Sequence, residues 1–345
     1  MDQQREAIGA FWGWWDGIRA KLAAAIDAGA VDPFIESLST QVHAISSRLS
    51  WELGAGREAR YQLCVTAEGD AEGRIITERW LAAAPDSDDA WEYVAARQPH
   101  ETPDLLVSIG DVELDLAEFY FAAYIDEPCE VIDLCVFHPV FAEVEADGDQ
   151  RAMATFLYLE QLLGEDGVAR WLGFVDIYTE PFADEAIDGQ GLREVVKALQ
   201  ARASGEHWIT LRGDVDGQPG ELEANVAIKR IDHLLLDTRI ELSIMLEDDI
   251  EGMPPAEEAE ALRAIEAEVL GAAGEHVVLL ARETHGGQRI LHLHAAADGP
   301  ALAAIDAVVE AHDDRAIGVD TEYDPTWEQL AAWREEIRAA REAPG

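Results

Sequence analysis

Residues 277–295 read VVLLARETHGGQRILHLHA, and this stretch decides the fold of the C-terminal part of the chain. Two runs rich in aliphatic residues flank the pair Gly286-Gly287. Paired glycines between such runs are typical of a two-residue β-hairpin turn. The sequence therefore predicts a strand from Val277 to Thr284, a tight turn, and a second strand from Arg289 to Ala295.

Helices and strands alternate on both sides of this hairpin. The expected elements are a strand at 239–247, a helix from after Pro255 to about Leu270, the hairpin, a helix at about 299–312 and a strand at 316–323. Residues 239–323 thus spell β-α-β-β-α-β, the ferredoxin-like order, and a terminal helix follows from about Pro325.

The residues before this region predict a separate domain. An amphipathic aromatic helix is expected at about 5–28, with Trp12 and Trp15 in the core, and Asp32 is expected to cap a second helix. Strands and helices follow, and Ala203-Ser204-Gly205 is the predicted boundary. The fold class predicted is α+β with two domains, an N-terminal one at 1–204 and a C-terminal one at 205–345.

Several segments of the C-terminal half carry a family resemblance. They are Trp208 in a strand, the turn Gly213 to Gly217, the strand Ala224-Asn225-Val226-Ala227, Gly252-Met253-Pro254 before a helix, and the hairpin at Gly286-Gly287. Over about residues 206–330 the chain resembles the uncharacterised family called domain of unknown function 695. The ferredoxin-like part is similar in layout to the regulator of ribonuclease E activity B, an acidic inhibitor of an RNA-degrading enzyme. These resemblances imply a regulatory protein and supply no catalytic residues.

The chain is strongly acidic, with 70 acidic and 25 basic residues and a formal net charge of −45. Such a charge repels phosphate backbones and anionic lipids, so we expect neither nucleic-acid nor membrane binding. A basic protein is the favoured partner. Residues Gln98 to Gln150 contain fourteen Asp or Glu and no Lys or Arg, which makes this stretch a candidate docking surface.

Three features bear on the location of the protein in the cell. No apolar run approaches the roughly 20 residues that a membrane-spanning helix needs, and the N-terminus lacks a signal-peptide pattern. Cys64, Cys129 and Cys135 lie in apolar contexts without CxxC spacing, so we expect reduced thiols in the core. A cytoplasmic protein without a cofactor is predicted, and the sequence indicates no oligomeric state.

Histidines gather in the hairpin region, where five of the ten lie between His276 and His312. The two-residue turn would pair Ala281 with His292 and Leu279 with His294. Glu283, His292 and His294 would then share one sheet face, and Leu280, Leu291 and Leu293 the other. In the ferredoxin-like order, Glu241 of the neighbouring strand would join them on the open face. Imidazole and carboxylate groups are ligands of divalent metals, so His292, His294 and Glu283 are candidate metal ligands.

Other motif searches identify no site. The chain contains no phosphate-binding loop, dinucleotide fingerprint or nucleophile elbow, and acidic pairs such as Asp248-Asp249 are expected to solvate turns. Three hypotheses therefore remain open. The protein is a non-enzymatic binding protein, of the inhibitor or immunity type, or a metal-dependent enzyme or metal-binding protein. Alternatively, its acidity and its content of only three lysines are adaptations to a salt-rich cytoplasm.

Overall fold

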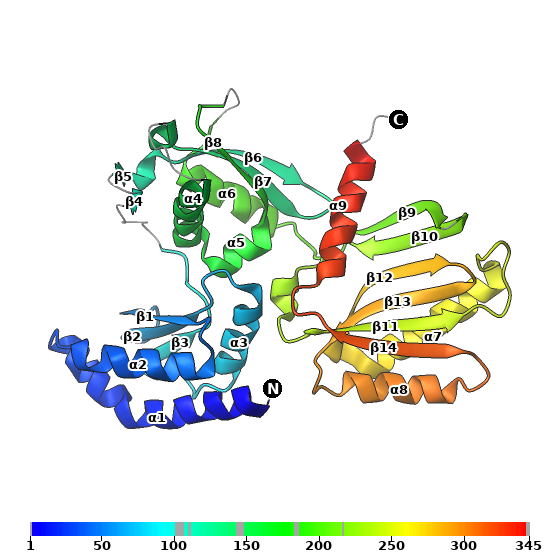
Figure 1. Ribbon diagram of the computed structural model, residues 1–345, viewed down its shortest axis with the longest axis horizontal. Helices are drawn as coiled ribbons and strands as arrows, with labels where there is room; N and C mark the ends of the chain where they lie inside the picture. The colour runs from blue at the N-terminus through cyan, green and yellow to red at the C-terminus, as the bar shows by residue number, and fades with distance from the viewer. Residues whose placement is uncertain are drawn as a thin grey trace. The chain divides into compact units, whose positions relative to one another are not determined.

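The computed structural model describes residues 2–100, 107–109, 112–142, 148–182, 186–215 and 217–342. The chain forms two compact units (Figure 1). Unit 1 comprises Met1–Asp126 and Val131–Arg202, and unit 2 comprises Glu127–Glu130 and Ala203–Gly345. Helices and strands occur together in both units, so the predicted α+β class is confirmed. In the described part of the chain, no helix is long and apolar enough to span a membrane.

The first part of unit 1 is a small sheet covered by helices. Its elements are α1 (Asp2–Asp27), α2 (Asp32–Ile45), β1 (Ser50–Ala55), β2 (Tyr61–Thr66), α3 (Ala71–Ala82) and β3 (Trp91–Val94). Strand β2 lies in the middle, antiparallel to β1 and parallel to β3.

Aromatic side chains fill the core of this part. Trp12 and Trp15 of α1 are buried, as predicted, against Trp80, Trp91 and Tyr93. The Trp15 indole donates a hydrogen bond to the Tyr93 hydroxyl at 2.9 Å, which satisfies a polar group that packing removes from water. The aromatic stripe of α1 is therefore core.

The second part of unit 1 holds another three-stranded sheet. Its elements are β4 (Val107–Ile109), β5 (Val112–Leu114), β6 (Tyr120–Asp126), β7 (Val131–Phe137), α4 (Gly148–Leu163), α5 (Glu165–Trp171), β8 (Leu172–Tyr178) and α6 (Gly189–Gln200), with short 3₁₀ helices at Leu116–Glu118 and Pro139–Ala142. Strand β7 is antiparallel to β6 and parallel to β8.

Unit 2 is built on one six-stranded antiparallel sheet. Its elements are β9 (Trp208–Val215), β10 (Gln218–Asn225), β11 (Thr238–Met245), α7 (Ala256–Ala273), β12 (Val277–His285), β13 (Gln288–Ala295), α8 (Ala301–Ala311), β14 (Ile317–Tyr323) and α9 (Glu328–Glu342), with short 3₁₀ helices at Arg230–His233 and Gly274–His276. The strand order is β14-β11-β13-β12-β10-β9, so β13 lies beside β11, as expected. Of the predicted Gly213–Gly217 turn, Asp216 lies outside the described residues.

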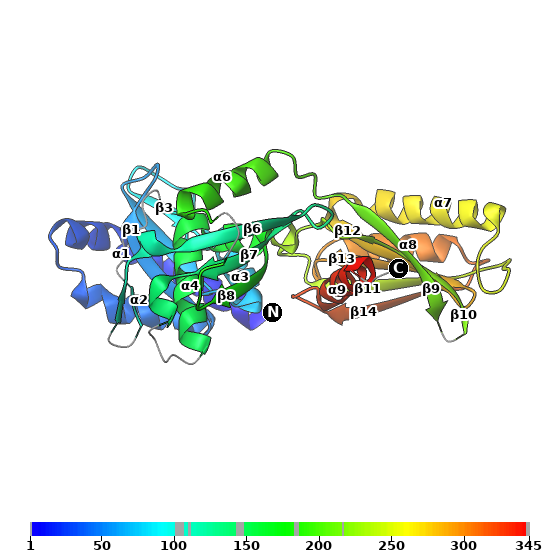
Figure 2. The same cartoon turned by 90° about the horizontal axis from the view of Figure 1, so that it is seen from above.

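The two faces of this sheet are covered by different helices (Figure 2). Leu291 and Leu293 of β13 pack with Leu262 of α7 and Ile305 of α8, so the predicted leucine face meets the helices. Helix α9 packs on the opposite face, where Trp333 contacts His292.

Three local predictions were wrong. The N-cap of α2 is Val31 rather than Asp32, which begins the helix and makes no side-chain cap. Helix α5 was missed because seven residues are too few to show a helical period. A β-bulge between Leu279 and Ala281 shifts the hairpin register, so Leu279 pairs with Leu293 and packs in the leucine core in place of Leu280.

Candidate functional site

Strand β13 brings the predicted metal ligands to the centre of the unit 2 sheet. His292 lies opposite Glu241 of β11 and Ala281 of β12. The bulge places His294 opposite Val278 rather than Leu279. Because residues directly opposite share a face in antiparallel pairs, Glu241, Glu283 and His292 lie together, as predicted.

His292 sits between two carboxylates. Its Nε2 is 3.2 Å from Glu283 Oε2, and a carboxylate only accepts, so Nε2 carries the hydrogen. This bond is the main reason why the pKa of Glu283 is lowered. The other ring nitrogen, Nδ1, is buried without a hydrogen-bond partner among the described residues, and Glu241 Oε1 lies 3.8 Å away.

His294 has a separate set of contacts. Its Nδ1 is 3.3 Å from the carbonyl oxygen of Leu236, and its Nε2 is 3.6 Å from Asp324 Oδ2. The ring also packs against Trp327 at 4.8 Å between centroids. Burial lowers the pKa of His294 to about 4, because the charged ring would lose its hydration. His294 is therefore a neutral structural side chain at physiological pH.

The predicted open face is covered at both histidines. Trp333 of α9 packs edge-on against His292 at 4.8 Å, and Trp327 just before α9 packs against His294. Only 5% of the surface of His292 and 1% of that of His294 is exposed. The expectation of an open His/Glu surface was wrong, because the terminal helix supplies the apolar cover that the isolated β-α-β-β-α-β unit lacks.

Of the three predicted metal ligands, the structure brings two together and gives the third other partners. The structure brings His292 and Glu283 into contact but directs the polar contacts of His294 to Leu236 and Asp324. Within the described residues, no group of three or more His, Cys, Asp or Glu side chains is arranged to hold a metal ion. A metal at His292, His294 and Glu283 stays a prediction that only metal analysis can test.

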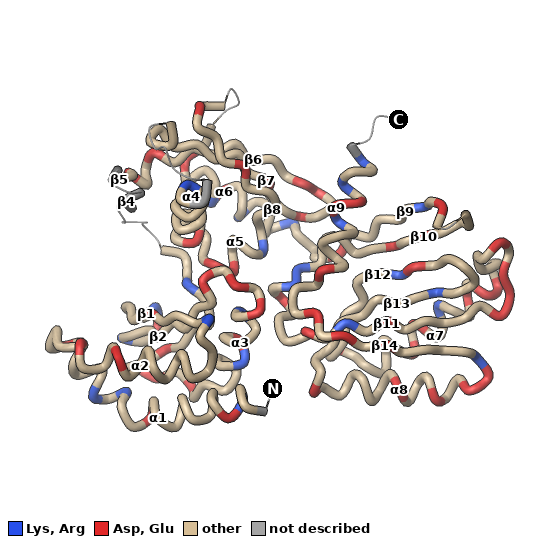
Figure 3. The backbone as a smooth tube through the Cα atoms, in the orientation of Figure 1, with Lys and Arg blue, Asp and Glu red and all other residues tan. Residues whose placement is uncertain are grey.

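A different feature of unit 2 is exposed and ordered. The loop between β11 and α7, which we call the acidic loop (residues 246–253), contains Glu247, Asp248, Asp249 and Glu251, and Figure 3 shows its acidic residues at one end of the unit. Ile250 lies among these carboxylates with 66% of its surface exposed, and Met245 beside the loop is 45% exposed.

Backbone hydrogen bonds hold the acidic loop against the hairpin turn. Leu246 N donates to Gly287 O at 2.9 Å, and Gly287 N donates to Gly252 O at 3.1 Å. Ile250 and Met253 exchange two more bonds, and Asp249 Oδ1 accepts from Gly252 N at 2.8 Å. Ile250 is thus presented on a constrained backbone.

The charge of the acidic loop is only partly neutralised. Arg315 contacts Glu247 Oε2 at 3.3 Å and Glu258 Oε1 at 2.7 Å. Asp248, Asp249 and Glu251 form no ion pair with any residue that the structure describes. Ile250 therefore has three carboxylates as near neighbours in the sequence, none with a positive partner in the described part of the chain.

The base-free stretch Gln98–Gln150 is a weaker docking candidate than it appeared from composition. Residues 101–106, 110–111 and 143–147 of it lie outside the described residues. Several of its other carboxylates bind the chain itself: Glu130 accepts from Ser204 N and Gly205 N, and Asp133 from Phe174 N. Docking at this stretch stays a prediction.

The segment that carries the acidic loop and both histidines is similar to a known family. Residues 206–331 match DUF695, a family of unknown function. The DUF695 segment covers β9 to β14 and ends within the first turn of α9, so the resemblance predicted over 206–330 is confirmed. No curated protein and no solved structure matches the chain.

Within the DUF695 segment, sequence reasoning found the histidines but missed Ile250. The available signal was an isolated large apolar residue inside an acidic turn. Adjacent carboxylates such as Asp248-Asp249 are frequent at this acid content, so composition indicates only turn solvation there.

Proposed function

We propose that this protein is a non-enzymatic binding protein that regulates a basic protein partner through its acidic loop. The observation that supports this most is Ile250, an exposed aliphatic side chain on a hydrogen-bonded loop whose carboxylates at positions 248, 249 and 251 form no ion pair with any described residue. The interaction would take place in the cytoplasm, where the three free thiols of Cys64, Cys129 and Cys135 would stay reduced.

The loop combines two kinds of interaction energy. A partner pocket that buries Ile250 would remove apolar surface from water, and such central anchors dominate the free energy of many interfaces. Asp248, Asp249 and Glu251 around it would pair with Lys or Arg of the partner. Rim charges contribute little affinity each, but they orient the partner and exclude acidic competitors.

The charge of the whole chain would accelerate this encounter. A protein of −45 attracts a basic partner over distances beyond direct contact, which raises the association rate at low ionic strength. Binding should therefore weaken as salt is added, mainly through slower association.

The layout of residues 238–323 supports an inhibitory role. Its element order β-α-β-β-α-β and its strand order β14-β11-β13-β12 are consistent with the ferredoxin-like unit that we propose here, the layout in which the sequence resembles an acidic inhibitor. Because fold alone does not establish function, the proposal depends on the acidic loop rather than on this similarity.

Site-directed photo-crosslinking would identify the partner. A benzophenone amino acid at position 250 is expected to capture a basic protein in cells of the source organism, and mass spectrometry would identify it. The affinity of the purified partner is then measured for the wild type, for Ile250→Ser, and for a variant with Asp248→Asn, Asp249→Asn and Glu251→Gln.

The two loop variants should each bind at least about tenfold more weakly, because each loses roughly 1.4 kcal/mol or more of binding free energy. Asn at position 249 keeps the side-chain oxygen that accepts the hydrogen bond from Gly252 N, so we expect the loop to remain folded. A matched control removes three exposed carboxylates elsewhere in unit 2, with Glu310→Gln, Asp313→Asn and Asp314→Asn. Equal weakening by the loop and control variants would contradict a local docking site, and an acidic captured protein would contradict the proposal.

A further inference from the structure

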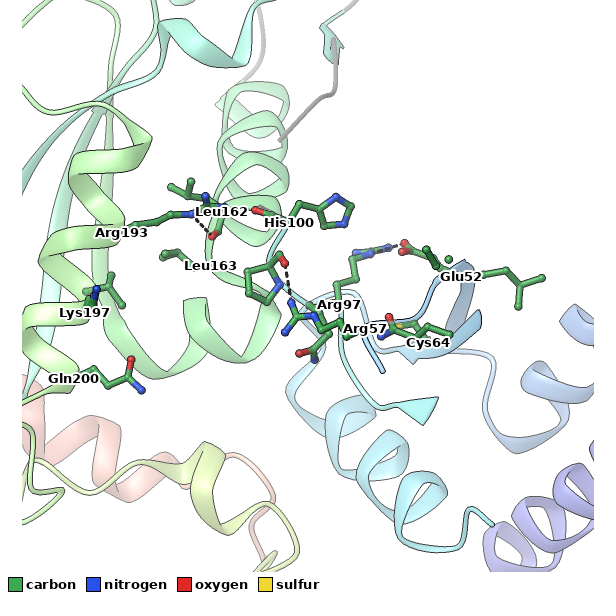
Figure 4. Close-up of a pocket in the computed structure, with 17 residues that line it drawn as sticks. Glu52, Arg57, Cys64, Arg97, His100, Leu162, Leu163, Arg193, Lys197 and Gln200 are labelled. Carbon is green, nitrogen blue, oxygen red and sulfur yellow. Dashed lines mark hydrogen bonds and ion pairs between the residues drawn. The ribbon is translucent and has the colours of Figure 1, made fainter. Parts of the chain in front are cut away.

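Unit 1 contains a cleft that neither the family match nor the proposed function explains. Its volume is about 1300 Å³, which is larger than the roughly 300–1,000 Å³ typical of small-molecule pockets. Figure 4 shows Arg193 and Lys197 of α6 on one wall and Arg57 and Arg97 on the other. All of these residues belong to unit 1.

The charge of the lining is opposite to that of the chain. Acidic residues outnumber basic ones by 70 to 25 overall, yet the described lining contains four basic residues and one acidic residue, Glu52. His100 adds a further nitrogen base. Chance placement of so few basic residues would not favour a mostly basic lining, so we look for a ligand that this charge would bind.

The charge of Arg97 is neutralised by carboxylates of the chain itself. Its guanidinium contacts Glu52 Oε1 at 2.6 Å, Glu68 Oε1 at 3.0 Å, and Glu160 Oε2 and Glu165 Oε1 at 3.3 Å each. The side chain is mostly buried, so these contacts are weakly screened. Arg97 therefore holds the wall together and is not the group that attracts a ligand.

Arg57 and Lys197 are different. The Arg57 guanidinium donates to the carbonyl oxygen of Pro99 at 2.9 Å and forms no ion pair with any residue that the structure describes. Lys197 is exposed, and its side-chain ammonium forms no ion pair or hydrogen bond with any described residue. Because Lys197 follows Arg193 by four residues, the two side chains lie on the same side of α6.

Apolar side chains complete the lining. The cleft is also lined by Leu53 of β1, Leu162 and Leu163 at the end of α4, and Val196 of α6. A site with both surfaces suits a ligand that has an apolar body and an acidic group.

We propose that this cleft binds a small organic anion, a carboxylate, phosphate ester or sulfonate attached to an apolar body. The positive charges of Arg57 and Lys197, on opposite walls of the cleft, attract the acidic group, and the leucines and Val196 contact the body. The net charge of the protein does not prevent this, because the Debye length of about 8 Å at physiological ionic strength screens distant carboxylates more than the lining. A nucleic acid would still meet the acidic outer surface, so the ligand is small.

Anilinonaphthalene sulfonate tests this class of ligand, since it joins an apolar ring system to one negative charge and fluoresces when bound. We expect saturable binding at one site per chain. The double variant Arg57→Gln, Lys197→Gln should bind about tenfold more weakly, while the matched control Lys21→Gln, Arg263→Gln, at two exposed positions outside the cleft, should bind like the wild type.

Phenylnaphthylamine keeps the rings but lacks the sulfonate. It should bind the wild type about tenfold more weakly than the sulfonate does, and it should bind the wild type and the double variant equally.

Circular dichroism checks that the double variant is folded. If it unfolds, the single changes Lys197→Gln and Lys197→Arg at an exposed position replace it. Lys197→Arg should retain binding and Lys197→Gln should reduce it. Unchanged sulfonate binding in the folded cleft variants, or equal affinity for the neutral probe, would overturn the proposal.

Discussion

His292 and His294 are two residues apart in β13, yet different groups surround them. His292 donates to Glu283 and has a second carboxylate, Glu241, 3.8 Å from its other nitrogen. His294 donates to a backbone carbonyl and is covered by Trp327. Two positions on one strand therefore have different hydrogen-bond partners.

Acidification should destabilise the protein through His294. Its pKa is lowered from 6.5 to about 4 in the folded state, so between these values the unfolded chain binds the proton and the folded chain does not. Stability from His294 is fully present above pH 6.5 and is lost as the pH falls toward 4, by up to about 3 kcal/mol at 1.4 kcal/mol per pKa unit.

Urea unfolding of the wild type and of His294→Gln between pH 7 and pH 4 measures this contribution. The variant should have a shallower pH dependence. His43→Gln, a change at an exposed position, should retain the wild-type slope. Parallel curves for wild type and His294→Gln would show that His294 does not stay neutral in the folded state.

At this scale, the sequence allowed the contact of Glu283 with His292 to be predicted, because a two-residue turn sets the register of the nearby strand positions. It did not allow the surroundings of His294 to be predicted. Those depend on the bulge near Leu280 and on Trp327, more than thirty residues further along the chain. Such contacts between distant residues leave no local pattern.

Among the elements, α9 is the one whose position most changes the interpretation of unit 2. Its existence was expected from about Pro325, but an amphipathic helix can dock on any complementary apolar surface. Trp333, Leu330 and Ile337 of α9 are buried. The docking site on the sheet became evident only from the structure.

Replacing Trp333 with alanine should destabilise unit 2 by about 3–5 kcal/mol, because it leaves a large cavity above His292. Thermal unfolding followed by circular dichroism would measure this loss. Glu335→Ala, an exposed change on the same helix, is the control and should alter stability by less than about 0.5 kcal/mol. A small effect of Trp333→Ala would mean that α9 is not firmly docked.

The acidic loop makes a second prediction at the level of elements. Gly252 has φ +82°, and an added Cβ would lie 3.1 Å from Gly286 N and 3.2 Å from Gly287 N. Gly252→Ala should therefore destabilise the protein by more than about 1 kcal/mol.

Gly271→Ala is the matched control, since nothing lies within 4 Å of a Cβ at this position of α7. Alanine favours helix, so this variant should be more stable than the wild type by about 0.4–1 kcal/mol. Denaturation midpoints of both variants measure the two effects. A neutral Gly252→Ala would mean that the loop moves freely against the hairpin turn.

For the whole molecule, the charge of −45 destabilises the compact state by self-repulsion, which salt screens. We expect the midpoint of thermal unfolding to rise between ~10 mM and ~150 mM NaCl, as the Debye length falls from about 30 Å to about 8 Å. If the midpoint of thermal unfolding stays constant above ~150 mM NaCl, a binding role for the acidic residues is favoured. If the midpoint continues to rise into molar salt, adaptation to a salt-rich cytoplasm is favoured.

The whole-chain charge was predictable because it is a sum over residues. The basic cleft was not, because Arg57, Arg97 and Lys197 are far apart in sequence and only folding brings them to one lining. Composition thus predicts the average charge of the surface but not a local basic cleft.

The path of the chain has one consequence for dissecting the molecule. Glu127–Glu130 belongs to unit 2 although the residues on both sides belong to unit 1, and Lys229 Nζ donates to Cys129 O and Glu130 O at 2.7 and 3.0 Å. A fragment that starts at Ala203 would lack both acceptors and leave a buried amine without them. We therefore expect the family-matched segment to lose these two hydrogen bonds when it is excised at one cut, and a protease that cleaves near residue 203 would leave unit 2 in two pieces of chain.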